Sequence, residues 1–202
     1  MPADKIRQQI PLDLRDGTPV LLRPVRPQDK SRFVEGLRLM SLESRYLRFF
    51  APVGSFSEKQ LAYLTEVDQR QHVAWGALDP LDPNFPGFGV ARYVREEDAP
   101  EVAEVAVAVI DSMHRRGLGT VLLGLLYLLA GWGGVRVFRG TILPANSFLI
   151  DWARALQAQI RFVDGAYQVD VPVHRRLEAL PDSEEGTRFK TELAYLQSLL
   201  FE

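Results

Sequence analysis

The feature that most constrains the fold is an abrupt change of periodicity near the middle of the chain. In the run EVAVAV, residues 104–109, valine alternates with alanine after the glutamate, which is the two-residue period of a strand. The basic turn HRRGLGT follows, and then TVLLGLLYLLAGWGG, an apolar run that predicts a helix. A helix that opens after such a turn presents backbone N–H groups without intrahelical partners, at the positive end of its dipole. The turn therefore predicts a site for an anion such as phosphate.

The residues of this turn narrow the choice of ligand. Gly117 and Gly119 let an anion approach the backbone without meeting a Cβ, and Arg115 and Arg116 add positive charge. A nucleoside triphosphate loop needs a lysine after its last glycine, and a dinucleotide fingerprint needs a third glycine where this chain has Leu122. ATP, GTP and NAD are therefore disfavoured. A plain strand-to-helix turn with two solvated arginines remains the alternative.

The rest of the chain predicts further strands and helices around this motif. Proline- and aspartate-rich turns separate three extended segments that favour an antiparallel meander. Ser41 and Ser57 are expected to begin helices, the second with Gln60 in a capping box. Tyr46, Phe49 and Phe50 are expected in the core. The predicted strands cover 18–25, 72–79, 87–96, 101–111, 135–143, 160–165 and 166–173. The predicted helices cover 28–40, 41–50, 120–134, 144–158 and 183–202, and a further helix is capped by Ser57 and has Leu61 and Leu64 on one face.

The chain length suits one domain, predicted at 18–180, after an N-terminal extension, 1–17. The C-terminal segment, 181–202, predicts an amphipathic helix, which packs either on its own domain or on a partner. A homodimer through this helix stays an alternative. The apolar face consists of Phe189, Leu193, Leu196 and Leu200.

Composition excludes several functions. A formal net charge of -2 gives no broad basic field, so no nucleic-acid partner is expected. The chain has no cysteine, which excludes disulfides and thiol nucleophiles, and His72 and His174 lack neighbours at ligand spacing, so no metal is expected. No leader is recognisable, and the longest apolar run, 118–130, is too short to span a membrane. We therefore expect a cytoplasmic protein with no membrane partner.

Three segments together resemble a known family. AEVAVAVIDSMHRRGLGTVLL resembles the coenzyme A loop of the GNAT acetyltransferases. Two other segments are similar to the acetyltransferase domain of bacterial protein-lysine acetyltransferases. The first part of that domain resembles LLRPVRPQDKSRFVEGLRLMSLESRYLRFF, and a later part resembles PANSFLIDWARALQAQIRF. The resemblance covers about 18–173. It implies an α/β fold of the α+β type, with a mixed, mostly antiparallel sheet of about six or seven strands flanked by helices, and acetyl-CoA as cosubstrate.

The resemblance also implies the residues that bind the coenzyme. The amides of a central strand would bind the pantetheine arm, the glycine turn would bind the pyrophosphate, and Asn146 would contact the coenzyme. Three positions depart from the family pattern. His114 replaces glutamine or arginine, Ala153 replaces a tyrosine acid, and Gln157 replaces a glycine. The coenzyme-binding candidates are Val107, Val109, His114, Arg115, Arg116, Gly117, Leu118, Gly119, Thr120 and Asn146.

Glu104 is the candidate general base, because it interrupts a run of small apolar residues on a predicted central strand. Partial burial there would raise the pKa of a carboxylate toward the range useful for deprotonating an ammonium. Its position before the glycine turn also matches the catalytic glutamate of the resembling enzymes, although an ordinary exposed strand glutamate remains the alternative. We thus expect direct acetyl transfer to a primary amine, with lysine acetylation or a small-molecule acceptor both open. A catalytically weak, acyl-CoA-binding regulatory module is the competing hypothesis.

Overall fold

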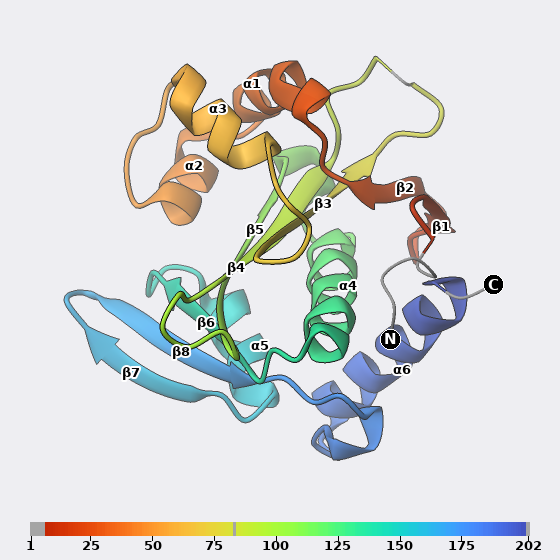
Figure 1. Ribbon diagram of the computed structural model, residues 1–202, viewed down its shortest axis with the longest axis vertical. Helices are drawn as coiled ribbons and strands as arrows, with labels where there is room; N and C mark the ends of the chain where they lie inside the picture. Colours follow the sequence, from red (N-terminus) through yellow and green to blue (C-terminus); the bar gives the residue numbers. More distant parts are fainter. Residues whose placement is uncertain (1–6, 83, 201–202) are drawn as a thin grey trace. The chain divides into compact units, whose positions relative to one another are not determined.

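The computed structural model describes residues 7–82 and 84–200, and the path of the chain can be followed in Figure 1. The described residues form two compact units, one of residues 7–92 and 107–123 and the other of residues 93–106 and 124–200. Eight strands form a single mixed sheet in the order β1-β2-β3-β4-β5-β6-β8-β7. The predicted α/β fold is confirmed, with one strand more than the highest number expected.

The additional strand lies in the segment predicted as an N-terminal extension. β1 (Ile10–Asp13) pairs antiparallel with β2 (Pro19–Pro24), and β2 pairs antiparallel with β3 (His72–Leu78). Ile10 and Leu12 alternate with the exposed Pro11 and Asp13 and are almost fully buried. The prediction missed β1 because four residues that include a proline give a weak strand signal.

The chain between β2 and β3 forms the helices of the first unit. The hydroxyl of Ser41 accepts a hydrogen bond from the Ser44 amide at 3.1 Å, and Ser57 and Gln60 form the predicted capping box. Both predicted helix starts are therefore confirmed, because a cap depends on residues only three apart. The elements are η2 (Pro27–Asp29), α1 (Lys30–Arg38), α2 (Leu42–Phe49) and α3 (Glu58–Thr65).

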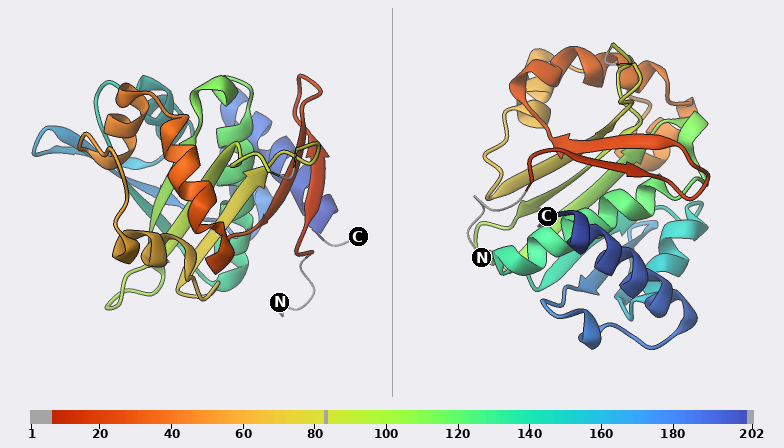
Figure 2. Two further views of the ribbon diagram at one scale, coloured as in Figure 1. Left: turned by 90° about the horizontal axis from the view of Figure 1, so that it is seen from above. Right: turned by 90° about the vertical axis from the view of Figure 1, so that its right-hand side faces the viewer.

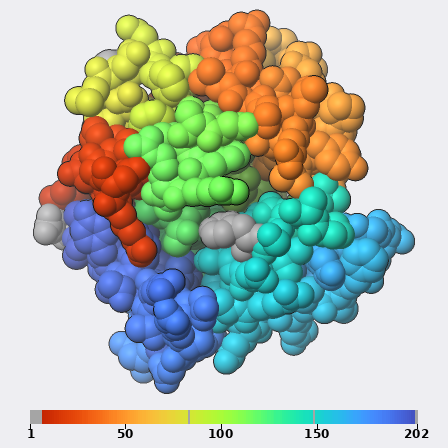
Figure 3. Space-filling view, turned by 180° about the vertical axis from the view of Figure 1, so that it is seen from behind, coloured from red at the N-terminus to blue at the C-terminus, as the bar shows by residue number. Residues whose placement is uncertain are grey.

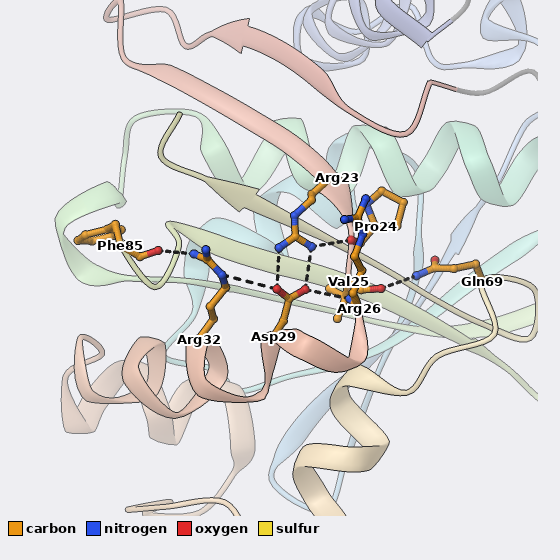
Figure 4. A network of polar contacts seen from close by, with 8 residues as sticks. All are labelled: Arg23, Pro24, Val25, Arg26, Asp29, Arg32, Gln69 and Phe85. Atoms are coloured by element: carbon orange, nitrogen blue, oxygen red, sulfur yellow. Dashed lines mark hydrogen bonds and ion pairs between the residues drawn. The ribbon is translucent and has the colours of Figure 1, made fainter. Parts of the chain in front are cut away.

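A buried carboxylate joins the start of α1 to β2 (Figure 4). Asp29 accepts two hydrogen bonds from Arg23, at 2.6 and 2.7 Å, and one from the Arg26 amide at 2.9 Å. Burial would raise the pKa of Asp29, but these bonds outweigh it and hold the pKa below its ordinary value. Arg32, which pairs with the same carboxylate, donates to the carbonyl of Phe85. The network thus fixes α1 to both β2 and the loop segment at Phe85.

The aromatic side chains of α2 do not fill the core as predicted. Tyr46 is 50% exposed and Phe50 is 41% exposed, and α2 has no buried residue. Phe50 ends the helix in the left-handed region, and Leu42, Tyr46 and Phe50, spaced by four, form a stripe open to solvent. Of these aromatic residues, Phe49 is the one with an aromatic partner among the described residues, Phe56, at 5.6 Å between ring centroids. Aromatic residue type predicted burial, but it does not specify which side of the helix the rest of the chain covers.

In the second unit, β8 lies between β6 and β7 and pairs antiparallel with both, while β6 pairs parallel with β5. Asp164 and Gly165 join β7 to β8 with positive φ at both positions, as a tight hairpin requires. The remaining elements are β4 (Gly89–Arg95), β5 (Val102–Val109), α4 (Leu118–Gly133), β6 (Val137–Ile142), α5 (Ser147–Ala155), β7 (Gln159–Val163), β8 (Ala166–Pro172), η4 (Leu177–Ala179) and α6 (Glu184–Leu200). β4, β5 and α4 each run through both units.

The C-terminal helix α6 packs on its own unit. Its four predicted apolar residues are at most 3% exposed, and it lies alongside α4 (Figures 1 and 2). A Cβ added at Gly124 would lie 3.1 Å from Leu196 and 3.3 Å from Leu193, so the glycine permits the close approach. The apolar face of α6 is therefore covered within the chain, and a homodimer stays a prediction. In 7–82 and 84–200, no helix is long and apolar enough to cross a membrane.

Candidate active site

The predicted strand, turn and helix are all present, and the turn itself lies in the first unit. β5 ends at Val109, a short 3₁₀ turn (Asp111–Met113) follows, and α4 begins at Leu118, two residues before its predicted start. Gly117 has φ +87°, and its carbonyl accepts the first helical hydrogen bond, from the Val121 amide at 3.1 Å. Arg115 also lies in the left-handed region, at φ +60°, which is uncommon for a residue with a Cβ. A constrained backbone therefore turns the chain at the point where the helix opens.

The opening of α4 has the properties of an anion site. The amides of Leu118, Gly119 and Thr120 make no hydrogen bond within the described residues. A Cβ added at Gly117 or Gly119 would meet no atom within 4 Å, so the space beside both glycines is open. The turn reaches the surface, where it appears in green next to the red β1–β2 hairpin (Figure 3). Free amides beside open space can bind a phosphate group.

The two arginines of the turn have different surroundings. The Arg116 guanidinium donates to the Asp16 carboxylate at 2.5 Å and to the hydroxyl of Thr18, which fastens the turn to the β1–β2 hairpin. Hydrogen bonds from Thr18 and Arg116 lower the pKa of Asp16 to about 2. The charge of Arg116 is therefore already partly balanced, whereas Arg115 is exposed. Phosphate contacts by either arginine stay a prediction.

His114 fastens the turn to the strand that precedes it. Its ring nitrogen Nε2 lies 2.9 Å from the carbonyl oxygen of Val109 and donates to it, because a carbonyl can only accept. The imidazole of His114 is itself exposed. The departure from the family pattern at this position thus has a structural use, and a coenzyme contact by His114 stays a prediction.

The pairing of β5 with β6 covers only the first part of β5. The pairing of β5 with β6 comprises three residue pairs and ends at Glu104 with Arg139, although β5 continues to Val109. The residues from Val105 to Val109 are small and apolar, yet all remain half-buried. Backbone amides on such a strand are suited to bind an extended ligand arm. This role for Val107 and Val109 stays a prediction.

Glu104 lies on the exposed face of β5, and the expectation of partial burial is wrong. Its neighbour Ala103 is fully buried, and strand alternation therefore turns the Glu104 side chain to the opposite face, where it is exposed. Within the described residues the Glu104 carboxylate has no hydrogen bond or ion pair. It is thus an accessible carboxylate with no structural partner.

Asn146 and Gln157 lie at the two ends of α5. Asn146 caps the helix by accepting a hydrogen bond from the Leu149 amide at 3.3 Å, so the residue has a structural use, and its coenzyme contact stays a prediction. Gln157 has φ +58°, and the amides of Gln157 and Ala158 bond back to Arg154 and Ala153 as in a Schellman motif. The left-handed turn is therefore retained although glycine is absent. Ala153 itself is buried.

His72, on β3, is a histidine outside the turn whose side chain has a hydrogen-bond partner. Arg92 donates to Nε2 of His72 at 3.0 Å and to the carbonyl of Leu64. Burial, with a smaller contribution from the charge of Arg92, lowers the pKa of His72 to about 4. Among the residues that the structure describes, no three histidine, aspartate or glutamate side chains are grouped to hold a metal ion.

Comparison with known proteins identifies the family. No family model matches the chain. Acetyltransferase Pat of Mycolicibacterium smegmatis is 38% identical over 141 residues, which are 68% of this chain and 40% of that protein. Acetyltransferase PA5475 of Pseudomonas aeruginosa is 30% identical over 143 residues, 71% of this chain and 76% of that protein. The chain thus spans two fifths of the length of the first relative and three quarters of the second.

Solved structures agree with these relatives. The GNAT domain of S. lividans PAT is 28% identical, covers 85% of this chain and 99% of its own, and superposes with a TM-score of 0.73. A GNAT superfamily phosphinothricin acetyltransferase from Sinorhizobium meliloti, solved in complex with AcCoA, shares the fold at 18% identity over 82% of this chain and 94% of its own, with a TM-score of 0.61. Fold and sequence identity agree, and the chain belongs to the GNAT acetyltransferase family.

Proposed function

We propose that the chain transfers an acetyl group from acetyl-CoA to a primary amine, directly within a ternary complex, with Glu104 as the general base. The observation that carries this proposal is an exposed carboxylate without a structural partner on β5, the strand that leads into the open glycine turn. The amides of Leu118, Gly119 and Thr120 bind the pyrophosphate of the coenzyme in this proposal. The amides of Val107 and Val109 bind the pantetheine arm.

The chemistry requires a neutral amine. Glu104 accepts a proton from the ammonium form of the acceptor, and the freed nitrogen attacks the thioester carbonyl carbon. A carbon–nitrogen bond forms, the carbonyl oxygen becomes an oxyanion, and collapse of this intermediate breaks the carbon–sulfur bond. The β5 amides stabilise the oxyanion as hydrogen-bond donors. The thiolate of coenzyme A takes its proton from solvent or from the second proton of the amine, because the position of the family's tyrosine acid is Ala153 here.

We further propose a protein lysine as the acceptor. This rests on the resemblance to the bacterial protein-lysine acetyltransferases, and the identities to acetyltransferases support it only at the level of acyl transfer. A small-molecule amine is the alternative acceptor. A panel that contains both a lysine peptide and small amines separates these two cases.

One observation favours a second candidate function. Ala153 removes the tyrosine acid that the resemblance implied, and a chain that binds acyl-CoA without turning it over would serve as a regulatory module. Such a module binds the coenzyme but releases no free thiol with any amine. The two functions therefore differ in one measurable product.

The test combines coenzyme binding with turnover. Calorimetric titration should show binding of acetyl-CoA and no binding of ATP. Glu104→Gln should reduce turnover on the best amine by about a hundredfold or more, the range that general-base catalysis supplies, and leave the Kd for acetyl-CoA within about twofold. Glu101→Gln is the matched control, because this exposed glutamate lies just before β5. Full turnover in Glu104→Gln would reject the base, and absence of coenzyme binding would reject the proposed function as a whole.

A further inference from the structure

A row of polar residues crosses four strands of the second unit and contains the proposed base. In the register of the sheet, Glu104 on β5 lies opposite Arg139 on β6, Arg139 lies opposite Asp170 on β8, and Asp170 lies opposite Gln159 on β7. Neighbouring strands are about 4.8 Å apart, so residues opposite each other are in side-chain reach. Ala103 and Phe138, which precede Glu104 and Arg139, are both buried, and the row therefore lies on the opposite face.

Arg139 is the basic residue of this row and the natural partner of Glu104. A carboxylate and a guanidinium opposite each other on adjacent strands attract each other. Nevertheless, no ion pair joins Glu104 and Arg139 in the part of the chain that the structure describes, although both residues belong to it. The structure must therefore hold the guanidinium elsewhere.

Two other carboxylates hold it. Arg139 donates from Nε and from a terminal nitrogen to the two carboxylate oxygens of Asp170, at 2.8 and 3.1 Å, and from its other terminal nitrogen to Glu96 at 2.7 Å. Glu96 follows β4, and its amide donates to the carbonyl of Val102 on β5. The side chain of Asp170 is 17% exposed and that of Arg139 is 40% exposed, so the Asp170 pair is partly shielded from water.

The hydrogen bonds between Arg139 and Asp170 also shift the pKa values of both residues. Hydrogen bonding from Arg139 holds the pKa of Asp170 below its ordinary value, and the bonds to Asp170 raise the pKa of Arg139. Asp170 is therefore ionised and Arg139 positively charged throughout the range in which an acetyltransferase would be assayed. A second arginine, Arg161 on β7, lies 3.6 Å from Asp170 on the side away from Glu104.

We propose that Asp170 is a positioning residue for the base: by binding the guanidinium of Arg139, it prevents Arg139 from pairing with Glu104 and leaves that carboxylate free to accept a proton from the amine. Glu96 gives the same help from the other side of β5. The inference rests on the proposed role of Glu104. A base that is already bound to a guanidinium is weaker, because the positive charge stabilises its ionised form.

The charged groups that face Glu104 in this unit are few. β6 brings Arg139, the end of β4 brings Glu96, and β8 and β7 bring Asp170 and Arg161 one and two strands beyond β6. Arg139 is the cation in the position directly opposite Glu104. A change in the titration of Glu104 on removal of Asp170 can therefore be assigned by also removing Arg139.

The first test is a carbon-13 NMR titration of the Glu104 carboxyl in the full chain, with the resonance assigned by its loss in Glu104→Gln. In Asp170→Asn, Arg139 should turn to Glu104, and the titration midpoint of Glu104 should fall by about half a pH unit or more. Asp182→Asn removes the carboxylate of another ion pair in the same unit, with Lys190, and should leave the midpoint unchanged. The double variant Asp170→Asn with Arg139→Gln should restore it.

The second test is catalytic and separates the inference from the proposed function. The value of kcat/KM for the amine should fall several-fold in Asp170→Asn at a pH where Glu104 is ionised, and recover in the double variant, while the Kd for acetyl-CoA stays the same. Glu96→Gln provides a more exposed substitution with a smaller shift in the same direction, should Asp170→Asn fail to fold. If the titration midpoint of Glu104 is unchanged in a folded Asp170→Asn variant, the inference is overturned, whatever the turnover of Glu104→Gln. Full turnover in Glu104→Gln overturns the proposed function instead, and with it the catalytic meaning of the row.

Discussion

At the scale of single residues, the anion site proposed at the glycine turn depends on two residues that have no Cβ. Gly117 needs its positive φ, whereas Gly119 lies within the first turn of α4 with ordinary helical backbone. A methyl group on Gly119 would touch no protein atom. Gly119 is thus the residue at which a ligand effect can be separated from a folding effect.

We predict that Gly119→Ala weakens acetyl-CoA binding roughly tenfold or more, because its methyl group takes the space proposed for the pyrophosphate. Stability should stay the same or rise by about 0.5–1 kcal/mol, since alanine favours a helix over glycine. Calorimetric titration measures the first quantity and urea unfolding the second. Gly36→Ala in α1 is the control, because its Cβ also meets open space, and it should leave the Kd unchanged. Equal affinity in both variants would place the pyrophosphate elsewhere.

Residue types and spacing predicted the turn but not the partners of its side chains. Gly117 and Gly119 were recognisable because their chemistry is local. The Arg116 contact with Asp16 spans a hundred positions and could not be read from the sequence. The exposure of Glu104 was only the alternative in the sequence analysis, because a carboxylate among small apolar residues predicts burial unless the strand face is known. The Arg139–Asp170 pair was missed as well. The sequence feature that could have indicated it is that β6 and β8 each carry a single charged residue.

At the scale of elements, local rules predicted where helices begin better than they predicted what covers them. The caps at Ser41 and Ser57 were identified from residues three apart. The exposed stripe of α2 and the edge strand β1 depend on tertiary neighbours, which periodicity does not specify. The end of α5 combines both cases, because Gln157 occupies a position that favours glycine and the Schellman motif forms all the same.

We predict that Gln157→Gly stabilises the chain by about 0.5–1 kcal/mol. A residue with a Cβ costs about 1 kcal/mol or more in the left-handed region, and glycine relieves this cost while adding some entropy to the unfolded chain. The exposed Gln157 side chain makes no hydrogen bond within the described residues, so its loss removes no contact. Urea unfolding should show a higher midpoint for Gln157→Gly and no gain for Gln157→Ala, which keeps the Cβ. A gain in both variants would point to the glutamine side chain rather than to the backbone.

At the scale of the whole molecule, a buried polar cluster links stability to pH. Arg92 is 5% exposed, contacts the ring of Phe33 at 5.7 Å and donates to Nε2 of His72. Because a guanidinium only donates, Nε2 must accept, and the imidazole is neutral in the folded state. Protonation of His72 would break this bond and place two cations side by side. Folding therefore opposes protonation at this position.

The sign of the resulting pH dependence follows from the two pKa values. His72 takes up its proton near pH 6.5 in the unfolded chain and near pH 4 in the folded chain, so the unfolded state binds more protons between these values. Its contribution to stability is complete above about pH 6.5 and is lost as the pH falls toward 4. We predict that His72→Gln, which keeps an acceptor for Arg92 but cannot titrate, removes about 1–2 kcal/mol of the stability loss between pH 7 and pH 5. Urea unfolding at both pH values measures the difference, and His174→Gln is the histidine control. The same loss in His72→Gln and in the unaltered chain would assign the acid sensitivity to other groups and leave the neutral imidazole without an energetic role.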